Sequence, residues 1–161
     1  MTNEEVLKRF KQTLDVVKKE NFHLQSVRSR LFPESEQVTV VWLANLLRTP
    51  EGEDRLESFG SKFARMQDTM IDKLLPRLIS AVGEIPGAAI DNLNRAERLG
   101  FINHADEWIA MRRLRNKLVQ EYIETGEEML PALIQANKFS DELQNSFEKI
   151  CVYAQEHLGI K

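Results

Sequence analysis

One short segment of this sequence carries most of the residues that suit chemistry. It is WIAMRRLRNKLVQEY, residues 108–122, and it places four basic residues within six positions. On a helix that turns 100° per residue, Arg115 falls in the middle of an apolar face and Arg112 falls at its edge. The apolar residues of that face are Trp108, Met111, Leu114, Leu118, Val119 and Tyr122. The other two basic residues, Arg113 and Lys117, point away from it, so the four do not form one basic stripe.

The position of Arg115 requires a partner or an opening. An arginine buried among apolar side chains without a counter-charge is strongly unfavourable. We therefore expect a carboxylate beside Arg115, or a cleft or an interface that opens onto it. From the residues alone, a structural arginine paired inside the protein is an alternative to a ligand-binding one. Tyr122, two turns further along nearly the same face, likewise has two interpretations, an ordinary core tyrosine or a functional one.

The sequence offers few other groups for catalysis or metal binding. It has one cysteine, Cys151, and three histidines, His23, His104 and His157, which are far apart. Neither a disulfide framework nor a zinc site of cysteines and histidines is therefore expected. No glycine-rich phosphate-binding loop is present, and the glutamates of residues 121–128 are interpreted as a solvated acidic end. We expect neither a metal nor a cofactor.

Length and composition indicate a single domain over residues 1–161. Hydrophobic residues make up 42% of the chain and charged residues 29%, an ordinary balance for a globular protein. The 22 lysines and arginines against 25 aspartates and glutamates give a net charge of -3, which disfavours DNA binding over the whole surface. No apolar run is long enough to span a membrane, and the N-terminus lacks the apolar core of a signal peptide. We expect a cytoplasmic protein without DNA or membrane contacts.

The apolar residues recur with helical periodicity along most of the chain. The segments expected to form helices are Asn3–Leu31, Val38–Leu47, Gly52–Val82, Ala88–Leu99, His104–Ile123 and a C-terminal region that ends near Leu158. Pro76 should kink the third of these, and Pro131 must start or bend a helix in the last region. Long helices with short connections predict an all-α fold, an up-and-down antiparallel helical bundle of about five to six helices.

Polar residues mark where several of these helices should begin. Thr2 and Glu5 have the spacing of a capping box. Asn103 is a suitable N-cap for the helix that follows it. Ser140 is a suitable N-cap for a separate last helix, because the two acidic residues after it favour the positive end of a helix.

The stretch LGFINHADEWIAMRRLRNKLVQEY, residues 99–122, resembles the signature region of the HEPN superfamily of small helical proteins. It is most similar to the nucleotidyltransferase substrate-binding branch and the HepT-like toxins. In that family a long helix carries an arginine, usually followed by asparagine, and then a histidine and a tyrosine five and seven residues after the arginine. The matching positions are Arg115, Asn116, Gln120 and Tyr122. The resemblance spans residues 53–153, and residues 33–50 look like an insertion.

The resemblance implies a helical bundle that forms a homodimer and pairs with a small nucleotidyltransferase, commonly as a toxin–antitoxin system. In active members, the arginine and the histidine of the motif cleave RNA without a metal, and both chains contribute to one cleft. The resemblance therefore implies that Arg115 and Asn116, with Arg112 at the edge of the same face, bind RNA or a nucleotide. It also implies that Tyr122 accepts nucleotide groups from the partner enzyme.

Gln120 departs from the family where the family has its histidine. Glutamine cannot take up or release a proton near neutral pH, whereas histidine can. The motif positions Arg115, Asn116 and Gln120 therefore favour binding over catalysis. Our first hypothesis is a non-catalytic HEPN-like binding module that acts with a small nucleotidyltransferase. The alternatives are an RNA-cleaving toxin with a degenerate motif and a purely structural helical dimer.

Overall fold

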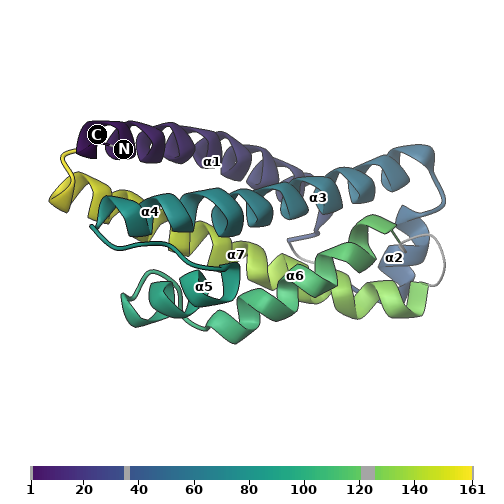
Figure 1. The fold of residues 1–161 in the computed structure, drawn as a ribbon. Helices are drawn as coiled ribbons and strands as arrows, with labels where there is room; N and C mark the ends of the chain where they lie inside the picture. Colours follow the sequence, from purple (N-terminus) through teal and green to yellow (C-terminus); the bar gives the residue numbers. More distant parts are fainter. Residues whose placement is uncertain (1, 35–36, 121–125, 161) are drawn as a thin grey trace.

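Four long helical rods run alternately up and down and form a bundle (Figure 1). The helices are α1 (Asn3–Leu31), α2 (Val40–Leu46), α3 (Pro50–Thr69), the π-helical turn η1 (Met70–Leu74), α4 (Leu75–Ala81), α5 (Ala89–Arg98), α6 (Ala105–Gln120) and α7 (Gly126–His157). This computed structural model describes residues 2–34, 37–118 and 129–160 in full, and the backbone alone of residues 119–120 and 126–128. The rods are α1, the continuous run α3–η1–α4, α6 and α7, and each packs on the next around the ring. The short helix α2 packs on α7 at one end, and α5 packs on α6 and α4 toward the other.

The predicted all-α bundle is confirmed. The described residues contain no strand, and they form six helices when α3, η1 and α4 are counted as one rod. The two termini lie at the same end of the bundle, as an even number of alternating rods requires (Figure 1). Within the described residues, no helix is both long and apolar enough to cross a membrane.

The first helix begins where the sequence predicts. The Thr2 hydroxyl accepts a hydrogen bond from the Glu5 N–H, and the Thr2 N–H donates to the Glu5 carboxylate, both at 3.2 Å. This reciprocal pair satisfies two backbone donors that the first turn of a helix would otherwise leave without partners. The apolar residues spaced seven apart along α1 then all face the core; they are Phe10, Val17, Leu24 and Leu31.

Aromatic side chains from three rods meet in the middle of the core. The rings of Trp108 in α6 and Phe139 in α7 contact edge to face, with centroids 5.2 Å apart. Phe63 in α3 meets Phe139 in the same manner at 6.3 Å. All three side chains are almost completely buried, so this cluster fixes the positions of α3, α6 and α7 relative to one another.

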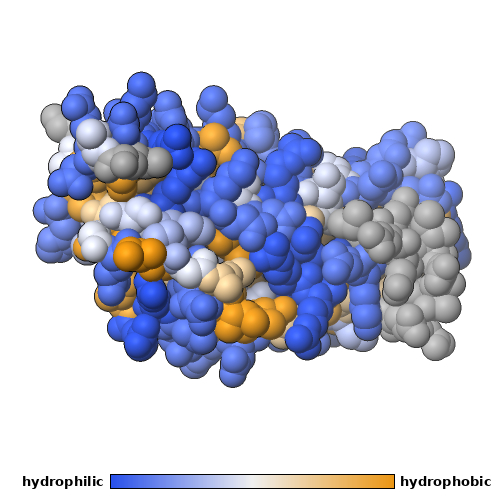
Figure 2. All heavy atoms as spheres, viewed as in Figure 1, coloured by the Kyte–Doolittle hydropathy of each residue, from blue (hydrophilic) through white to orange (hydrophobic). Residues whose placement is uncertain are grey.

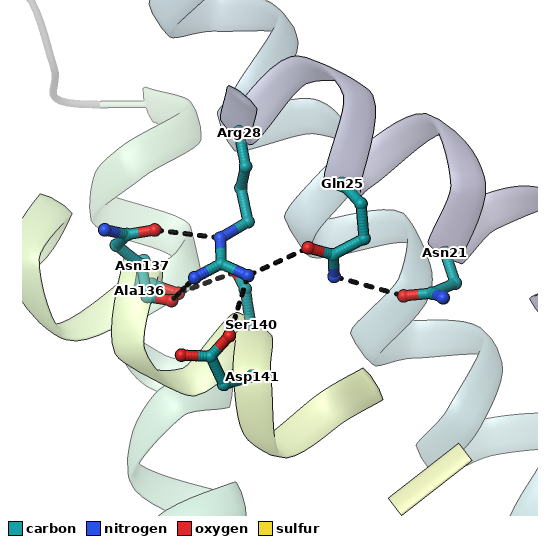
Figure 3. Close-up of polar contacts among 7 residues, drawn as sticks. All are labelled: Asn21, Gln25, Arg28, Ala136, Asn137, Ser140 and Asp141. Carbon is teal, nitrogen blue, oxygen red and sulfur yellow. Dashed lines mark hydrogen bonds and ion pairs between the residues drawn. The ribbon is translucent and has the colours of Figure 1, made fainter. Parts of the chain in front are cut away.

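A polar network fastens α1 to α7 (Figure 3). Arg28 of α1 donates through Nε to the Asn137 side chain and through Nη2 to the Asn137 carbonyl, both at 2.8 Å. Its Nη1 donates to Gln25 at 2.8 Å and to Asp141 at 2.9 Å. Gln25 in turn donates to Asn21. The planar guanidinium therefore makes four hydrogen bonds, three to α7 and one within α1, a geometry that a lysine does not reproduce.

The sequence predicts a disturbance at Pro76, and in the rod α3–η1–α4 it takes the form of a π-helical turn. The turn η1 directly precedes α4, and Pro76 is the second residue of α4. The Leu75 N–H reaches back to the Met70 carbonyl, five residues earlier. A proline has no N–H to donate, and its ring collides with the carbonyl four residues before it, so a wider turn accommodates the ring. The same turn carries Asp72.

Ser140 does not start a separate helix, so that prediction is wrong. The helix α7 is continuous from Gly126 to His157, and Pro131 lies inside it near its beginning. The Ser140 side chain is buried, and its hydroxyl donates to the Ala136 carbonyl one turn back at 2.8 Å. A serine that bonds its own helix in this way satisfies itself within the helix and does not cap one.

Asn103 is not the N-cap of α6, which also corrects the prediction. Its side-chain amide donates to Glu142 at 2.8 Å, and its side-chain oxygen accepts from Lys149 at 3.3 Å, so it binds α7. The first backbone donor of α6 is satisfied from α5, because the Glu97 carboxylate accepts from the Ala105 N–H at 2.9 Å. A long-range contact here replaces the local cap.

Candidate functional site

Arg115 lies on the side of α6 that faces α3, and it has the carboxylate partner that its place in the apolar face predicts. Its Nη1 donates to Oδ2 of Asp68 at 2.9 Å. One turn away, Arg112 forms a two-bond pair with Asp72 in η1, at 3.0 and 2.8 Å. The two aspartates are four residues apart and the two arginines are three apart. Each pair therefore lies on one face of its own helix, and the charges match across the helix contact.

The rest of the apolar face of α6 follows the prediction as far as the structure describes it. Trp108, Met111 and Leu118 are buried, and Leu114 is half-buried. Arg113 and Lys117 are exposed. The basic residues of α6 therefore divide into two that pair with α3–η1 and two that face solvent, as the helical wheel indicates.

The pair between Arg115 and Asp68 is incomplete. Nε of Arg115 and Oδ1 of Asp68 are shielded from solvent and have no hydrogen-bond partner among the described residues. A guanidinium can give two parallel hydrogen bonds to a carboxylate, as Arg112 does, whereas Arg115 gives one. Buried polar atoms without partners cost stability, so this pair is not optimised for stability.

Arg115 also borders a pocket of about 580 Å³ on the surface of α3 and η1. This volume is in the range of small-molecule sites. The charged and polar side chains that line it are Ser61, Arg65, Asp68, Thr69, Asp72, Lys73, Arg115 and Asn116. Both possibilities that the sequence allows for Arg115 are thus realised, since it has a carboxylate partner and it opens onto a pocket.

On the side of the pocket toward α1, Thr69 is bonded to a carboxylate. Its hydroxyl donates to Oε2 of Glu20 at 2.9 Å. Oε1 of Glu20 is shielded from solvent and has no partner in the described part of the chain. Burial raises the pKa of Glu20 above its ordinary value, although the Thr69 hydrogen bond and the charges of Arg65 and Lys73 oppose the rise.

The acidic residues of this site are not among those that the sequence singled out. The signal for Asp68 and Asp72 is their spacing of four, which puts them on one helix face, just as the spacing of three puts Arg112 and Arg115 on one face. This signal becomes readable only once α3 and α6 are known to pack together. Because the pairing of helices follows from tertiary structure, sequence reasoning had no means of choosing these aspartates. Glu20, on a third helix, carries no local signal at all.

A second groove, of about 270 Å³, lies between α5 and α6 and shares Arg115 and Asn116 with the pocket. Its apolar lining residues are Ala89, Ile90, Leu93 and Ile109, and the remaining ones are Arg112, Arg113, Arg115 and Asn116. The Ile90 side chain is 55% exposed. Figure 2 shows hydrophobic residues gathered over α5 and the adjacent part of α6, on a face that is otherwise mostly hydrophilic. The helix α6 therefore separates a charged pocket from an apolar groove.

Two predicted site residues, Gln120 and Tyr122, lie outside the residues whose side chains the structure describes. The three histidines, His23, His104 and His157, are exposed, and none of them lines the pocket. Among the described residues, no group of three or more histidines, cysteines, aspartates and glutamates is placed to hold a metal ion.

The comparisons with known proteins give no relative: no family model matches the chain, and no curated protein or solved structure matches it.

Proposed function

We propose that this chain is a non-catalytic, HEPN-like binding module that acts with a small nucleotidyltransferase. Arg115 grips RNA or a nucleotide, and Asn116 and Arg112 lie beside it on α6. The observation that carries the proposal is the position of Arg115, which borders a charged pocket and is only partly paired with Asp68. A guanidinium with unused donors beside such a pocket suits a phosphate or a carboxylate group.

The residues around Arg115 support binding better than cleavage. Metal-independent RNA cleavage by general acid–base catalysis uses a group that exchanges protons near neutral pH, for which histidine is the usual choice. The lining residues of the pocket include no histidine, and the motif position of the histidine is Gln120. In this proposal Tyr122 keeps its place in the motif as a candidate acceptor of nucleotide groups.

Two alternatives make different use of the same residues. An RNA-cleaving toxin with a degenerate motif is favoured by Arg115 and Asn116 and opposed by Gln120. A purely structural helical dimer is favoured by the ion pair with Asp68 and opposed by the unsatisfied atoms of that pair. A nucleotidyltransferase gene beside this one in the genome would favour the first two functions over the structural one, and would support the toxin–antitoxin assignment.

The binding role of Arg115 can be tested against its neighbour. Arg115→Ala and Arg113→Ala remove the same charge from the same helix, but only Arg115 lines the pocket. Fluorescence anisotropy with a labelled single-stranded RNA should give about a tenfold higher Kd for Arg115→Ala, because the charge-assisted hydrogen bonds from the Arg115 guanidinium to the RNA are lost. The Kd of Arg113→Ala should change less than about threefold, and the RNA should stay intact. Equal losses in both variants would mean that only general charge attracts the RNA, which would contradict the proposal.

A further inference from the structure

Two basic residues of the pocket, Arg65 and Lys73, are not part of the motif on α6. They are on α3 and η1, two turns apart, and Thr69 stands midway between them. Both side chains are exposed and line the pocket. Neither forms an ion pair with any residue of the described chain, although both act on Glu20 across the contact with α1.

The charges around the pocket leave these two cations available. The carboxylates of Asp68 and Asp72 are engaged by Arg115 and Arg112, at 2.9 and 2.8 Å. Glu20 is held by the Thr69 hydroxyl and is half-buried. Free positive charge therefore concentrates at Arg65 and Lys73, while the aspartates keep the pocket as a whole close to neutral.

The spacing of the two cations suits one anionic group. Eight residues along a helix correspond to roughly 12 Å, and an arginine and a lysine side chain reach about half that distance each. The two can therefore converge above Thr69 on a phosphate that accepts hydrogen bonds from both. The neighbouring carboxylates repel a second phosphate in the pocket. Hydroxyl groups can bind there, because the Asp72 carboxylate accepts hydrogen bonds and the Asn116 amide can both accept and donate them.

We propose that this pocket binds a phosphomonoester that also carries hydroxyl groups, with its phosphate held between Arg65 and Lys73. The inference rests on the proposed function in using the same pocket, and it specifies the ligand chemistry and two ligand-binding residues on α3–η1. A sugar phosphate and a nucleoside monophosphate share this chemistry.

The test is a calorimetric titration of the full chain with four probes: inorganic phosphate, ribose 5-phosphate, adenosine 5′-monophosphate and unphosphorylated ribose. The double variant Arg65→Gln/Lys73→Gln removes both cations of the pocket. The matched control Arg48→Gln/Arg55→Gln removes two exposed arginines that line neither the pocket nor the groove between α5 and α6. Circular dichroism checks that both variants keep the helical fold.

We expect the phosphorylated sugars to bind more tightly than inorganic phosphate, and ribose not to bind. The Kd for the phosphorylated sugars should rise about tenfold or more in the pocket variant, and less than about threefold in the control variant. Tighter binding of adenosine 5′-monophosphate than of ribose 5-phosphate would identify a nucleotide as the ligand, and the reverse a sugar phosphate. Equal losses in the two variants, or no binding of any phosphorylated probe at millimolar concentration, would overturn the inference.

The outcome separates this inference from the proposed function. The inference would stand and the proposed function would fail if the Arg65/Lys73 variant lost binding of the small probes while Arg115→Ala left RNA binding unchanged. Arg115-dependent RNA binding without any response to the small probes would do the opposite.

Discussion

Arg115 pairs with Asp68 through one nitrogen, and its side chain stays 21% exposed. Partial exposure lowers the desolvation cost of both charges, which explains how an apolar helix face tolerates the arginine. Full burial of Arg115 would require two hydrogen bonds to its carboxylate, as in the pair between Arg112 and Asp72. The incomplete pair and the adjacent pocket are the two observations on which the proposed binding role of Arg115 rests.

Glu20 predicts a particular dependence of stability on pH. Burial raises its folded-state pKa above the ordinary value of 4.5, with a smaller contribution from the nearby charge of Asp68. The Thr69 hydrogen bond and the charges of Arg65 and Lys73 act in the opposite direction. The folded protein therefore holds the proton of the Glu20 carboxyl group more tightly than the unfolded chain does. Protonated Glu20 contributes its full stabilisation below pH 4.5, and this contribution is lost as the pH rises through the raised pKa.

Replacing the group should remove this dependence. In urea denaturation, the free energy of unfolding of Glu20→Gln relative to the wild type should be higher at about pH 7 than at about pH 4, because the amide carries no charge to bury. A relative stability that falls as the pH rises between these values would show that the Glu20 charge stabilises the fold.

At the scale of elements, the function of α6 depends on which face it turns inward. Leu118 is buried on the face that packs against α3, where its backbone carbonyl oxygen lies 3.3 Å from the point that a Cβ atom would occupy if Gly60 carried a side chain. Leu118→Ala should lower the free energy of unfolding by about 2–5 kcal/mol, through lost burial and the cavity left behind. The control Lys117→Ala, one residue earlier and exposed, should stay within about 0.5 kcal/mol. If Leu118→Ala lowered the free energy of unfolding by less than about 1 kcal/mol, Leu118 would not lie on the face of α6 that is turned into the core.

The sequence predicts those features of the fold that depend on local chemistry. The spacing of apolar residues located α1, α3 and α6, and the Thr2–Glu5 pair located a helix start, because both signals lie within a few turns. Asn103 and Ser140 look equally good as caps, yet each is satisfied by a tertiary or an in-helix contact. A sequence does not reveal which of several hydrogen-bond partners a polar side chain will meet.

The same limit applies to the candidate site. The wheel of α6 places Arg115 and requires a carboxylate, but the choice of Asp68 depends on how α3 packs against α6. The sequence also does not reveal the π-helical turn, which determines where Asp72 lies. The arginine side of the site was therefore predictable, whereas the α3–η1 side was not.

At the scale of the whole molecule, α6 divides the surface into a charged pocket and an apolar groove that share Arg115 and Asn116. We expect the homodimer that the family resemblance implies to form through this groove, with Arg115 at a cleft between the two copies. An exposed apolar groove of this kind is typical of a protein–protein contact.

Light scattering at micromolar concentration should therefore give the mass of a homodimer. Ile90→Asp, in the groove, should shift the protein toward the monomer, because it places a charge in the apolar contact. Val152→Asp, at a similarly exposed position of α7 outside the groove, should leave the mass unchanged. A wild-type monomer would count against the dimer, and equal effects of the two substitutions would place the contact elsewhere.

A cleavage assay on single-stranded RNA decides whether the chain binds RNA without cleaving it. The assay compares the wild type, Gln120→His, and Gln120→His combined with Arg115→Ala. Histidine restores a proton-exchanging group at the position where the resembling family has one. We predict no cleavage by the wild type and a gain of cleavage in Gln120→His that depends on Arg115. Strong cleavage by the wild type, abolished by Arg115→Ala, would contradict the proposed binding function and establish an active ribonuclease.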